Sequence, residues 1–262
     1  MQAGINVWTW GIDSKAQFEQ GVKEVADVGY KAVENLLGIV RLYGDDPSEF
    51  DALLRQYGVE FVCGYHHLSG DFDKDYANAE WCLKFLQGRM PKVMNLQAGG
   101  RATGGVTEAV LAQTVEQMTK LGELGQRHGT RFCRHPHYGT NVERQNELDY
   151  VMAKVPEKVL GLTIDTAHAV LGGMDPVGLA RQYGKRVGYM HVKDIQPSAG
   201  GGAWYTKFRE LGRGIVDFVG VAKALEEAGY GGVLCVELDG PRVSGYKSAA
   251  ISRGYLKDEL GL

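Results

Sequence analysis

The chain has 262 residues, of which 44% are hydrophobic, so it can bury a large core. Its formal net charge of -3 at pH 7 provides no basic surface of the kind that binds nucleic acid or an anionic membrane. The N-terminal MQAGINVWTW lacks the pattern of a signal peptide, and no apolar run of about 18 residues occurs, so we expect neither secretion nor a membrane span.

The four cysteines give information about the compartment. They show no CxxC spacing, and they are Cys63, Cys82, Cys133 and Cys235. Free, buried thiols are typical of a reducing cytosol, whereas secreted proteins of this size often use disulfides. We therefore expect a cytoplasmic protein without structural disulfides.

Short apolar runs alternate with helical patterns along the chain. In the first helix, Phe18, Val22 and Val25 recur on one face, and Gly29 follows as a C-terminal stop. The predicted strands cover residues 4–7, 32–34, 59–64, 93–96, 131–134, 159–164, 187–192 and 232–238. The predicted helices cover residues 15–28, 47–57, 73–86, 107–128, 144–154, 176–183, 216–228 and 244–256.

Eight strand and helix units in strict alternation predict a closed (β/α)8 TIM barrel, with one domain over residues 1–262. An open dinucleotide-binding fold is disfavoured, because the turn after the first strand does not contain GxGxxG. Residues 98–106 and 195–215 exceed ordinary loop length. Since such loops in a compact barrel usually cover the substrate, we expect both to lack regular structure and to be mobile in the empty protein.

Three predicted strands end at side chains that can bind a metal ion, namely Asp165, His191 and Glu237. The C-terminal ends of barrel strands meet at one face, so these side chains should lie together. Two carboxylates and one imidazole suit Mn²⁺, Mg²⁺, Co²⁺ or Zn²⁺. A fourth ligand should come from the fifth strand or its loop, where His135 ends the strand and Glu143 begins the next helix. These residue types leave both candidates open.

Four motifs resemble the xylose isomerase-like TIM barrels, a group of sugar isomerases and epimerases, inosose dehydratase and related lyases. The motifs are DTAH at 165–168, HVKD at 191–194, LGRGIVDF at 211–218 and VEL at 236–238. The segment HPHYGTNVE at 135–143 is most similar to the inosose dehydratase branch. The resemblance covers most of the chain from the fifth strand onward, and before the fourth strand only the spacing matches.

The resemblance implies a divalent metal, most readily Mn²⁺, held by a glutamate on the fifth strand and by the Asp, His and Glu that match Asp165, His191 and Glu237. This chain has a histidine, His135, where many members have the fifth-strand glutamate. Glu143 is therefore the preferred fourth ligand, and His135 is its substitute. The resemblance also implies that His168 contacts the substrate, and that Lys193 takes part in proton transfer.

A metal that chelates a ketone and its neighbouring hydroxyl acidifies the carbon between them, because the enediolate charge develops against the cation. Glu237 or Glu143 could take the proton, and Lys193 or His135 could supply one. We expect an isomerase or epimerase that acts on a keto sugar through a metal-bound enediolate. The alternative is a lyase, either inosose dehydratase-like or cleaving a 3-keto-glycoside by β-elimination. An endonuclease for abasic DNA is less favoured, because the chain is acidic.

Other polar residues at strand ends could bind a carbohydrate substrate. Glu34 could bind a sugar hydroxyl, or equally pair with a nearby base, and one of His66 and His67 should contact the substrate. His137 is a further candidate, although it alternates with His135 along the chain, so that one of the two should be structural. We also expect a homo-oligomer, because barrels of this group often associate.

Aromatic and basic residues near the predicted mouth have two interpretations. Trp8, Trp10 and Trp204 could offer apolar platforms to a sugar ring, although a buried tryptophan at a barrel end is more common. Arg41 and Arg101 could bind a phosphate or carboxylate group, although solvated arginines are more common.

Overall fold

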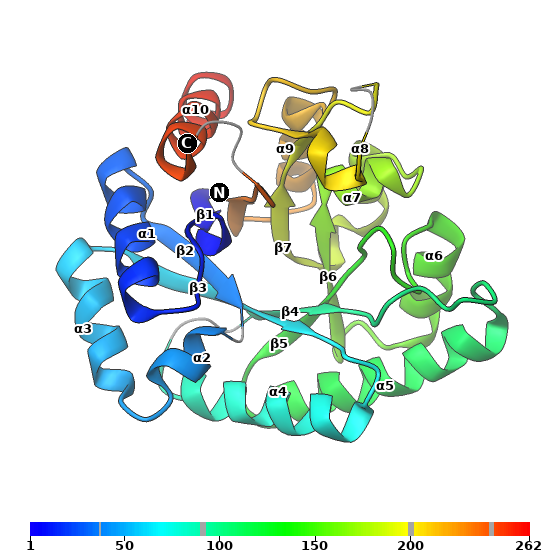
Figure 1. The fold of residues 1–262 in the computed structure, drawn as a ribbon. Coiled ribbons are helices and arrows are strands. Elements are labelled where there is room, and N and C mark those ends of the chain that lie inside the picture. The colour runs from blue at the N-terminus through cyan, green and yellow to red at the C-terminus, as the bar shows by residue number, and fades with distance from the viewer. Residues whose placement is uncertain (37, 90–92, 199–201, 241–243) are drawn as a thin grey trace.

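The computed structural model describes residues 1–36, 38–89, 93–198, 202–240 and 244–262. Within these ranges, eight parallel strands form a barrel, and helices surround it on the outside (Figure 1). The barrel strands are β1 (Gln2–Asn6), β2 (Ala32–Leu36), β3 (Glu60–His67), β4 (Val93–Gln97), β5 (Arg131–His135), β6 (Leu160–Asp165), β7 (Val187–Val192) and β10 (Val233–Val236). Because β1 pairs with both β2 and β10, the barrel is closed and the predicted fold class is confirmed.

The helices follow the strands in the order that the sequence predicts. They are α1 (Lys15–Val28), α2 (Gly38–Tyr43), α3 (Pro47–Tyr57), α4 (Phe72–Leu86), α5 (Glu108–Arg127), α6 (Gln145–Lys154), α7 (Thr166–Leu171), α8 (Pro176–Tyr183), α9 (Phe218–Glu227) and α10 (Gly245–Leu260). In the described part of the chain, no helix is both long and apolar enough to cross a membrane.

Helix α1 shows why the predicted bounds agree well with the structure. The side chain of Ser14 accepts a hydrogen bond from the backbone N–H of Gln17, which satisfies an otherwise free donor at the N-terminus. Phe18 and Val22 are fully buried, and Gly29 ends the helix with φ of 96°, a conformation that glycine adopts without strain. The cap, the apolar face and the stop all lie in the sequence itself.

The core lies between the barrel and the helices. Phe50 of α3 is at the centre of one aromatic cluster, with ring centroids 5.9 Å from Phe18, 5.4 Å from Phe61 and 5.5 Å from Phe85. This cluster joins α1, α3 and α4 to β3. It holds three helices against the outside of the barrel.

The segment after β7 differs from the prediction, which treats residues 195–215 as structureless. It contains a short hairpin of β8 (Asp194–Ile195) and β9 (Phe208–Arg209), with the 3-10 helix η3 (Trp204–Lys207) between them. The reason is Asp194, whose buried carboxylate accepts hydrogen bonds from the backbone N–H groups of Gly214 and Val216. Asp194 therefore holds the end of the segment against its beginning. The prediction that residues 195–215 lack regular structure is wrong.

Two short helices are also absent from the prediction, α2 and α7. Each has six residues, which is too short for a helical period to stand out. Helix α7 matters for the site, because Asp165 ends β6 and is also the N-cap of α7. The chain thus turns from strand to helix directly at a predicted metal ligand.

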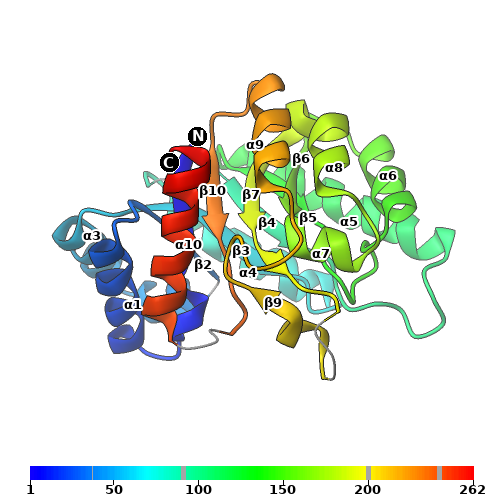
Figure 2. The ribbon, with the colours of Figure 1, turned by 90° about the horizontal axis from the view of Figure 1, so that it is seen from above.

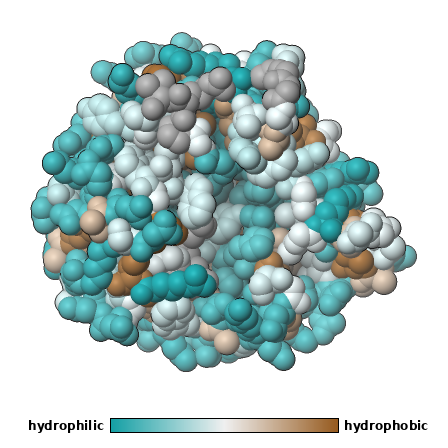
Figure 3. All heavy atoms as spheres, viewed as in Figure 1, coloured by the Kyte–Doolittle hydropathy of each residue, from teal (hydrophilic) through white to brown (hydrophobic). Residues whose placement is uncertain are grey.

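The C-terminal ends of the strands face one side of the barrel. In Figure 2 the arrowheads of β7 and β10 point toward the side that carries β9. Figure 1 looks onto this side, and the space-filling view from the same direction has a hollow in its middle (Figure 3). The predicted ligands end their strands at this face.

Replacing Gly172 by alanine is expected to lower the free energy of unfolding by about 1–3 kcal/mol. Gly172 follows α7 with an ordinary helical φ of -79°, but a Cβ there would lie 1.8 Å from the carbonyl oxygen of Glu143. The segment after β5 would have to move. Urea unfolding measures the effect. Gly104→Ala is the control, because nothing lies within 4 Å of its added Cβ, and equal midpoints for the two variants would contradict the close packing.

Candidate active site

Four buried side chains from consecutive barrel strands converge at the C-terminal face. His135 ends β5, Asp165 ends β6, His191 lies near the end of β7, and Glu237 directly follows β10. His191 Nδ1 is 3.1 Å from Glu237 Oε2 and 3.6 Å from Asp165 Oδ2, and His135 Nε2 is 3.5 Å from the same Asp165 oxygen. The strand ends therefore bring the predicted aspartate, histidines and glutamate together.

Several buried atoms of these side chains make no hydrogen bond among the described residues, although Asp165 Oδ2 and Glu237 Oε2 lie within ion-pair distance of Lys193 Nζ. The atoms without a hydrogen bond are both ring nitrogens of His135, Asp165 Oδ2, His191 Nδ1 and Glu237 Oε2. Unpaired buried polar atoms are costly, so each calls for an explanation. Ligand atoms about 2.1 Å from one cation would be about 3.0 Å apart at right angles and about 3.4 Å apart in a tetrahedron. The separations among His135, Asp165 and His191 are close to these values, so these three side chains fit a divalent cation, and Glu237 Oε2 approaches them at 3.1 Å from His191 Nδ1.

The opposite atoms of the same side chains are fixed by the fold. Asp165 Oδ1 accepts a 2.9 Å hydrogen bond from the backbone N–H of His168, as the cap of α7. Glu237 Oε1 accepts a 3.2 Å hydrogen bond from Asn6 Nδ2 at the end of β1. Each carboxylate therefore has one oxygen held by the protein and the other directed at the centre. This arrangement orients ligands before a metal arrives.

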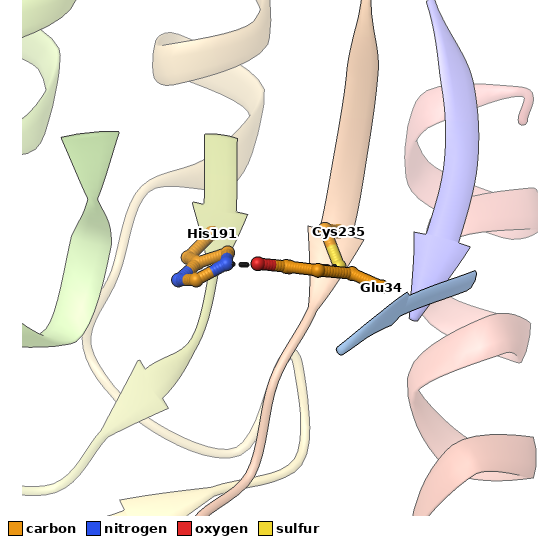
Figure 4. A group of neighbouring side chains, drawn as sticks. All are labelled: Glu34, His191 and Cys235. Atoms are coloured by element: carbon orange, nitrogen blue, oxygen red, sulfur yellow. Dashed lines mark hydrogen bonds and ion pairs between the residues drawn. The ribbon is translucent and has the colours of Figure 1, made fainter. Parts of the chain in front are cut away.

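Glu34 holds the imidazole of His191 in the same manner. Its fully buried carboxylate is 2.6 Å from His191 Nε2, accepts a 2.9 Å hydrogen bond from Asn95 Nδ2, and accepts one of 3.2 Å from Cys235 Sγ. Figure 4 shows the Glu34 side chain reaching His191, with Cys235 beside it. A carboxylate that accepts the proton of one ring nitrogen leaves the other nitrogen with its lone pair for a metal. The ligand atoms of these three side chains also lie close enough to bind a cation, but the hydrogen bond already uses Nε2.

The sequence offers two roles for Glu34, and in the structure it pairs with a base. Its side chain has no exposed surface, and both oxygens have partners. A contact between Glu34 and substrate stays a prediction.

Lys193 lies beside the carboxylates with its ammonium group buried. Its Nζ is 2.8 Å from Glu237 Oε2, 3.5 Å from Asp165 Oδ2 and 3.4 Å from Asp239 Oδ2. Burial alone would lower the pKa of Lys193, but the negative charges of Asp165, Asp239 and Glu237 outweigh it and raise the pKa above its ordinary value. Burial would likewise raise the pKa of Asp165 and Glu237, but Lys193 and neighbouring imidazoles hold both well below the usual range. The ammonium and both carboxylates therefore stay charged at neutral pH.

Three histidines near Lys193 are neutral because they are buried. Burial lowers the pKa of His135 to about 4 and that of His137 to about 3, and it holds the pKa of His168 well below its ordinary value. His168 Nε2 is 3.4 Å from Lys193 Nζ, and its ring stacks on His137 with centroids 3.5 Å apart. Trp204 of η3 covers His168 at 5.3 Å. A neutral His135 keeps a lone pair for a metal, and His168 is placed to interact with Lys193.

Glu143, the preferred fourth ligand in the sequence, is engaged elsewhere. Its Oε2 accepts a 2.7 Å hydrogen bond from the N–H of Gly139, and its Oε1 is 3.2 Å from the Arg101 guanidinium. Within the described ranges, His135, Asp165 and His191 form a group whose ligand atoms lie within 4.8 Å of one another, and neither Glu143 nor Glu237 is among them. Glu237 differs from Glu143 because its Oε2 lies 3.1 Å from His191 Nδ1. His135 is therefore the fifth-strand residue beside the centre. A role of Glu143 as ligand or base stays a prediction.

Arg101 ties the loop after β4 to the loop after β5. It binds Glu147 with two hydrogen bonds of 2.7 and 3.3 Å and donates to the carbonyl of Thr140 at 3.0 Å, so its guanidinium is used within the protein. Replacing Arg101 by alanine is expected to speed amide hydrogen exchange in residues 98–106 and 139–147, because both loops lose this tie. Hydrogen exchange with mass spectrometry measures the change.

Arg89→Ala is the matched control for this prediction. The side chain of Arg89 has the same exposed fraction as that of Arg101, 24%. Arg89 also forms a bidentate ion pair, with Asp51. Its loss should leave the exchange of residues 98–106 unchanged. If both arginine variants exchange alike in those residues, Arg101 does not hold the loop.

A cavity of about 580 Å³ opens beside the centre on the side of β3. His67, the last residue of β3, is exposed and lines it, whereas His66 is buried and does not. Of the two histidines considered for substrate contact, His67 is therefore the one with access to open space. Its contact with substrate stays a prediction.

Two further residues of the site escape sequence reasoning, Asn6 and Asp239. Asn6 is a polar residue that follows Ile5 at the end of the first strand, and Asp239 follows Glu237 by two positions. Neither feature is specific enough to identify a site residue in the sequence. Asn6 and Glu237 are 231 positions apart and come into contact because the barrel is closed.

Comparison with known proteins gives a family and a set of relatives. Residues 22–258 match the model described as xylose isomerase-like TIM barrel. Inosose dehydratase from Geobacillus kaustophilus is 27% identical over 252 residues, which cover 84% of this chain and 80% of that protein.

Solved structures share the fold at low sequence identity. The IolI protein with a bound zinc atom matches with a TM-score of 0.80 at 16% identity and covers 98% of this chain and 97% of its own. The probable 3-DHS dehydratase AsbF from Bacillus anthracis gives 0.81 at 16%, with coverage of 99% and 100%. D-allulose 3-epimerase from Methylomonas sp. gives 0.78 at 19%, with coverage of 98% and 96%.

These relatives bear on the predicted activity. The name of the Geobacillus relative indicates that the chain is an enzyme, whereas the solved structures, at 16% to 19% identity, show the fold alone. The relative with the highest identity of these, the Geobacillus protein, is named a dehydratase. The comparisons therefore support the predicted isomerase or epimerase only in part, and they favour the lyase alternative.

Proposed function

We propose that this chain, which belongs to the xylose isomerase-like TIM barrel family, is a metal-dependent carbon–oxygen lyase. Its substrate would be a cyclic polyhydroxy ketone, from which it removes the oxygen substituent β to the carbonyl. The name of the inosose dehydratase relative supports this reaction class. The observation that carries the proposal is the 2.8 Å separation between Lys193 Nζ and Glu237 Oε2.

That pair places a proton acceptor and a proton donor on one side of the centre. An elimination needs a base at the carbon next to the carbonyl and an acid at the departing oxygen, and adjacent groups can serve both. Epimerisation instead needs proton exchange on both faces of the carbon. Where many family members have a second glutamate, this chain has His135, a neutral imidazole. The one-sided pair therefore favours elimination.

The proposed metal ligands are Asp165, His191, Glu237 and His135, with Glu143 as the alternative to His135. A bound divalent cation would supply Lewis-acid polarisation of the substrate ketone. Mn²⁺ is the first candidate. Zn²⁺ is the second, because the IolI structure contains zinc and because imidazole is a common zinc ligand.

Each residue then has a defined part. Glu237 takes the proton next to the carbonyl, and such a base contributes about 10² to 10⁴ in rate. The Lys193 ammonium protonates the departing oxygen. His168, 3.4 Å behind Lys193, and Asp239, at 3.4 Å, hold the ammonium in place. His137 and His67 would contact substrate hydroxyl groups.

Proton NMR in D₂O tests the reaction on protein loaded with Mn²⁺ or Zn²⁺. Inosose, 3-keto-glucosides and ketohexoses would be presented in turn. We expect the proton next to the carbonyl to disappear together with the β-oxygen substituent. Deuterium incorporation into a rearranged sugar that retains every oxygen would instead establish an isomerase or epimerase.

We further propose that one barrel domain over residues 1–262 carries the activity, as a cytoplasmic homo-oligomer. The four cysteines are free and buried, which suits a reducing compartment. Light scattering tests the oligomer, and a solution mass equal to the 28.7 kDa of the chain would refute it.

A further inference from the structure

The cavity beside the centre suggests what leaves during the reaction. We infer that this cavity is a leaving-group subsite for an aromatic aglycone, so that the substrate is a keto-glycoside rather than a free cyclitol. The inference rests on the proposed elimination and deepens it. The cavity lies among η1 (Val7–Trp10), the start of α2, the end of β3 and the first turns of α4. It has a volume of about 580 Å³.

Tyr65 connects the cavity to the reacting centre. It lines the cavity, and its ring lies parallel to that of His191 with centroids 6.4 Å apart. The same ring meets His135 edge-on at 5.5 Å. A group in the cavity is therefore separated by one aromatic ring from two of the proposed metal ligands.

Trp8 forms an aromatic wall of the cavity. Its side chain is 42% exposed, so part of its ring is open to a ligand. Its backbone N–H donates a 2.8 Å hydrogen bond to Asn6 Oδ1, and Asn6 Nδ2 donates to Glu237 Oε1. Asn6 thus contacts both the backbone of Trp8 and the proposed base, so the residue that carries the exposed ring and Glu237 share one neighbour.

The size and lining of the cavity fit a phenolic group. Pockets for drug-sized ligands measure about 300–1,000 Å³, and a departing hydroxide needs no such space. Ile12 and Leu42 add apolar surface beside Trp8. At the rim, Arg41 and Lys74 have no ion pair in the described part of the chain, and they can donate hydrogen bonds to hydroxyl oxygens. Asp13 and Asp75 line the same cavity and balance the two cations, so a neutral aromatic group fits better than an anion.

The chemistry balances without an added oxidant or reductant. In a 3-keto-glycoside, Glu237 takes the proton on C2, next to the C3 ketone. The C2–H electron pair forms a C1–C2 double bond, and the C1–O bond to the aglycone breaks. Lys193 gives a proton to the departing phenolic oxygen. The products are a free phenol and a 2-hydroxy-1,2-unsaturated 3-keto sugar.

The test uses the full chain loaded with Mn²⁺ and three substrates: 4-nitrophenyl 3-keto-β-glucoside, methyl 3-keto-β-glucoside and inosose. Nitrophenol release and NMR give kcat/KM for each. The nitrophenol and methanol leaving groups differ in intrinsic leaving ability. We therefore divide kcat/KM for the aryl glucoside by kcat/KM for the methyl glucoside and compare this ratio between variants. We expect Trp8→Ala to lower this ratio about tenfold, since the ring loses its stacking partner.

Trp81→Ala is the control, because Trp81 has nearly the same exposure, 40%, and does not line the cavity. It should leave the ratio unchanged. A ratio that Trp8→Ala does not change, or elimination from inosose with none from the aryl glycoside, would overturn the subsite and leave the lyase intact. If no substrate loses its β-substituent, the proposed function itself fails.

Discussion

Replacing Asp165 by asparagine is expected to abolish tight metal binding and to lower kcat/KM about 10³-fold or more. Asp165 Oδ2 lies 3.5 Å from His135 Nε2 and 3.6 Å from His191 Nδ1, so it is shared by both imidazoles. The asparagine keeps an oxygen to cap α7 through His168 N–H, but it loses the negative charge. A metal contributes several kcal/mol to such a reaction, and each 1.36 kcal/mol is a factor of ten.

Calorimetric titration with Mn²⁺ and Zn²⁺ measures the affinity, and the NMR assay measures turnover. Asp175→Asn is a matched control, because Asp175 is also an N-cap, accepting from the N–H groups of Val177 and Gly178 on α8, and it lies outside the centre. It should bind metal as the wild type does. If the Asp165 variant retains full metal affinity, this group of side chains is not the metal site.

The strand ends explain why much of this site can be predicted from the sequence. Asp165, His191 and Glu237 each interrupt an apolar run, and the C-terminal ends of barrel strands share one face. A reader of the sequence who counts eight units can therefore place these three residues together. In the structure, His191 Nδ1 lies 3.6 Å from Asp165 Oδ2 and 3.1 Å from Glu237 Oε2.

The fourth position is harder to predict, because it depends on the path of a loop. Glu143 has the residue type that the family resemblance favours, but Arg101 and the Gly139 N–H hold its carboxylate. Arg101 reaches it from a loop 42 positions earlier in the chain. Such a long-range contact leaves no local pattern in the sequence. His135 needs no loop, since it is the last residue of β5.

The same limit applies to residues that orient the ligands. Glu34 and His191 are 157 positions apart, and they meet only because the barrel interior brings β2 and β7 together. A carboxylate at the end of a short strand is equally compatible with a surface ion pair or a substrate contact. Burial decides among these, and burial depends on the whole barrel.

Glu34→Gln is expected to weaken metal binding by about 10- to 100-fold. Glu34 is not one of the proposed metal ligands, and it acts by orienting His191. Both of its oxygens act as acceptors, one from Asn95 Nδ2 and the other from His191 Nε2 and Cys235 Sγ. A glutamine brings an NH₂ group to one of these positions, where a donor would face a donor. His191 then loses the anion that fixes its ring and directs Nδ1 at the centre.

Metal titration separates this orienting role from a loss of fold. Glu210→Gln is the control, because Glu210 is another buried carboxylate, bound by Ser248 Oγ at 2.8 Å and lying outside the centre. Both variants should lose thermal stability, since each alters a buried hydrogen bond, but only Glu34→Gln should lose metal affinity. If the two variants bind metal equally well, Glu34 contributes to packing alone, and the tautomer of His191 is set by the metal itself.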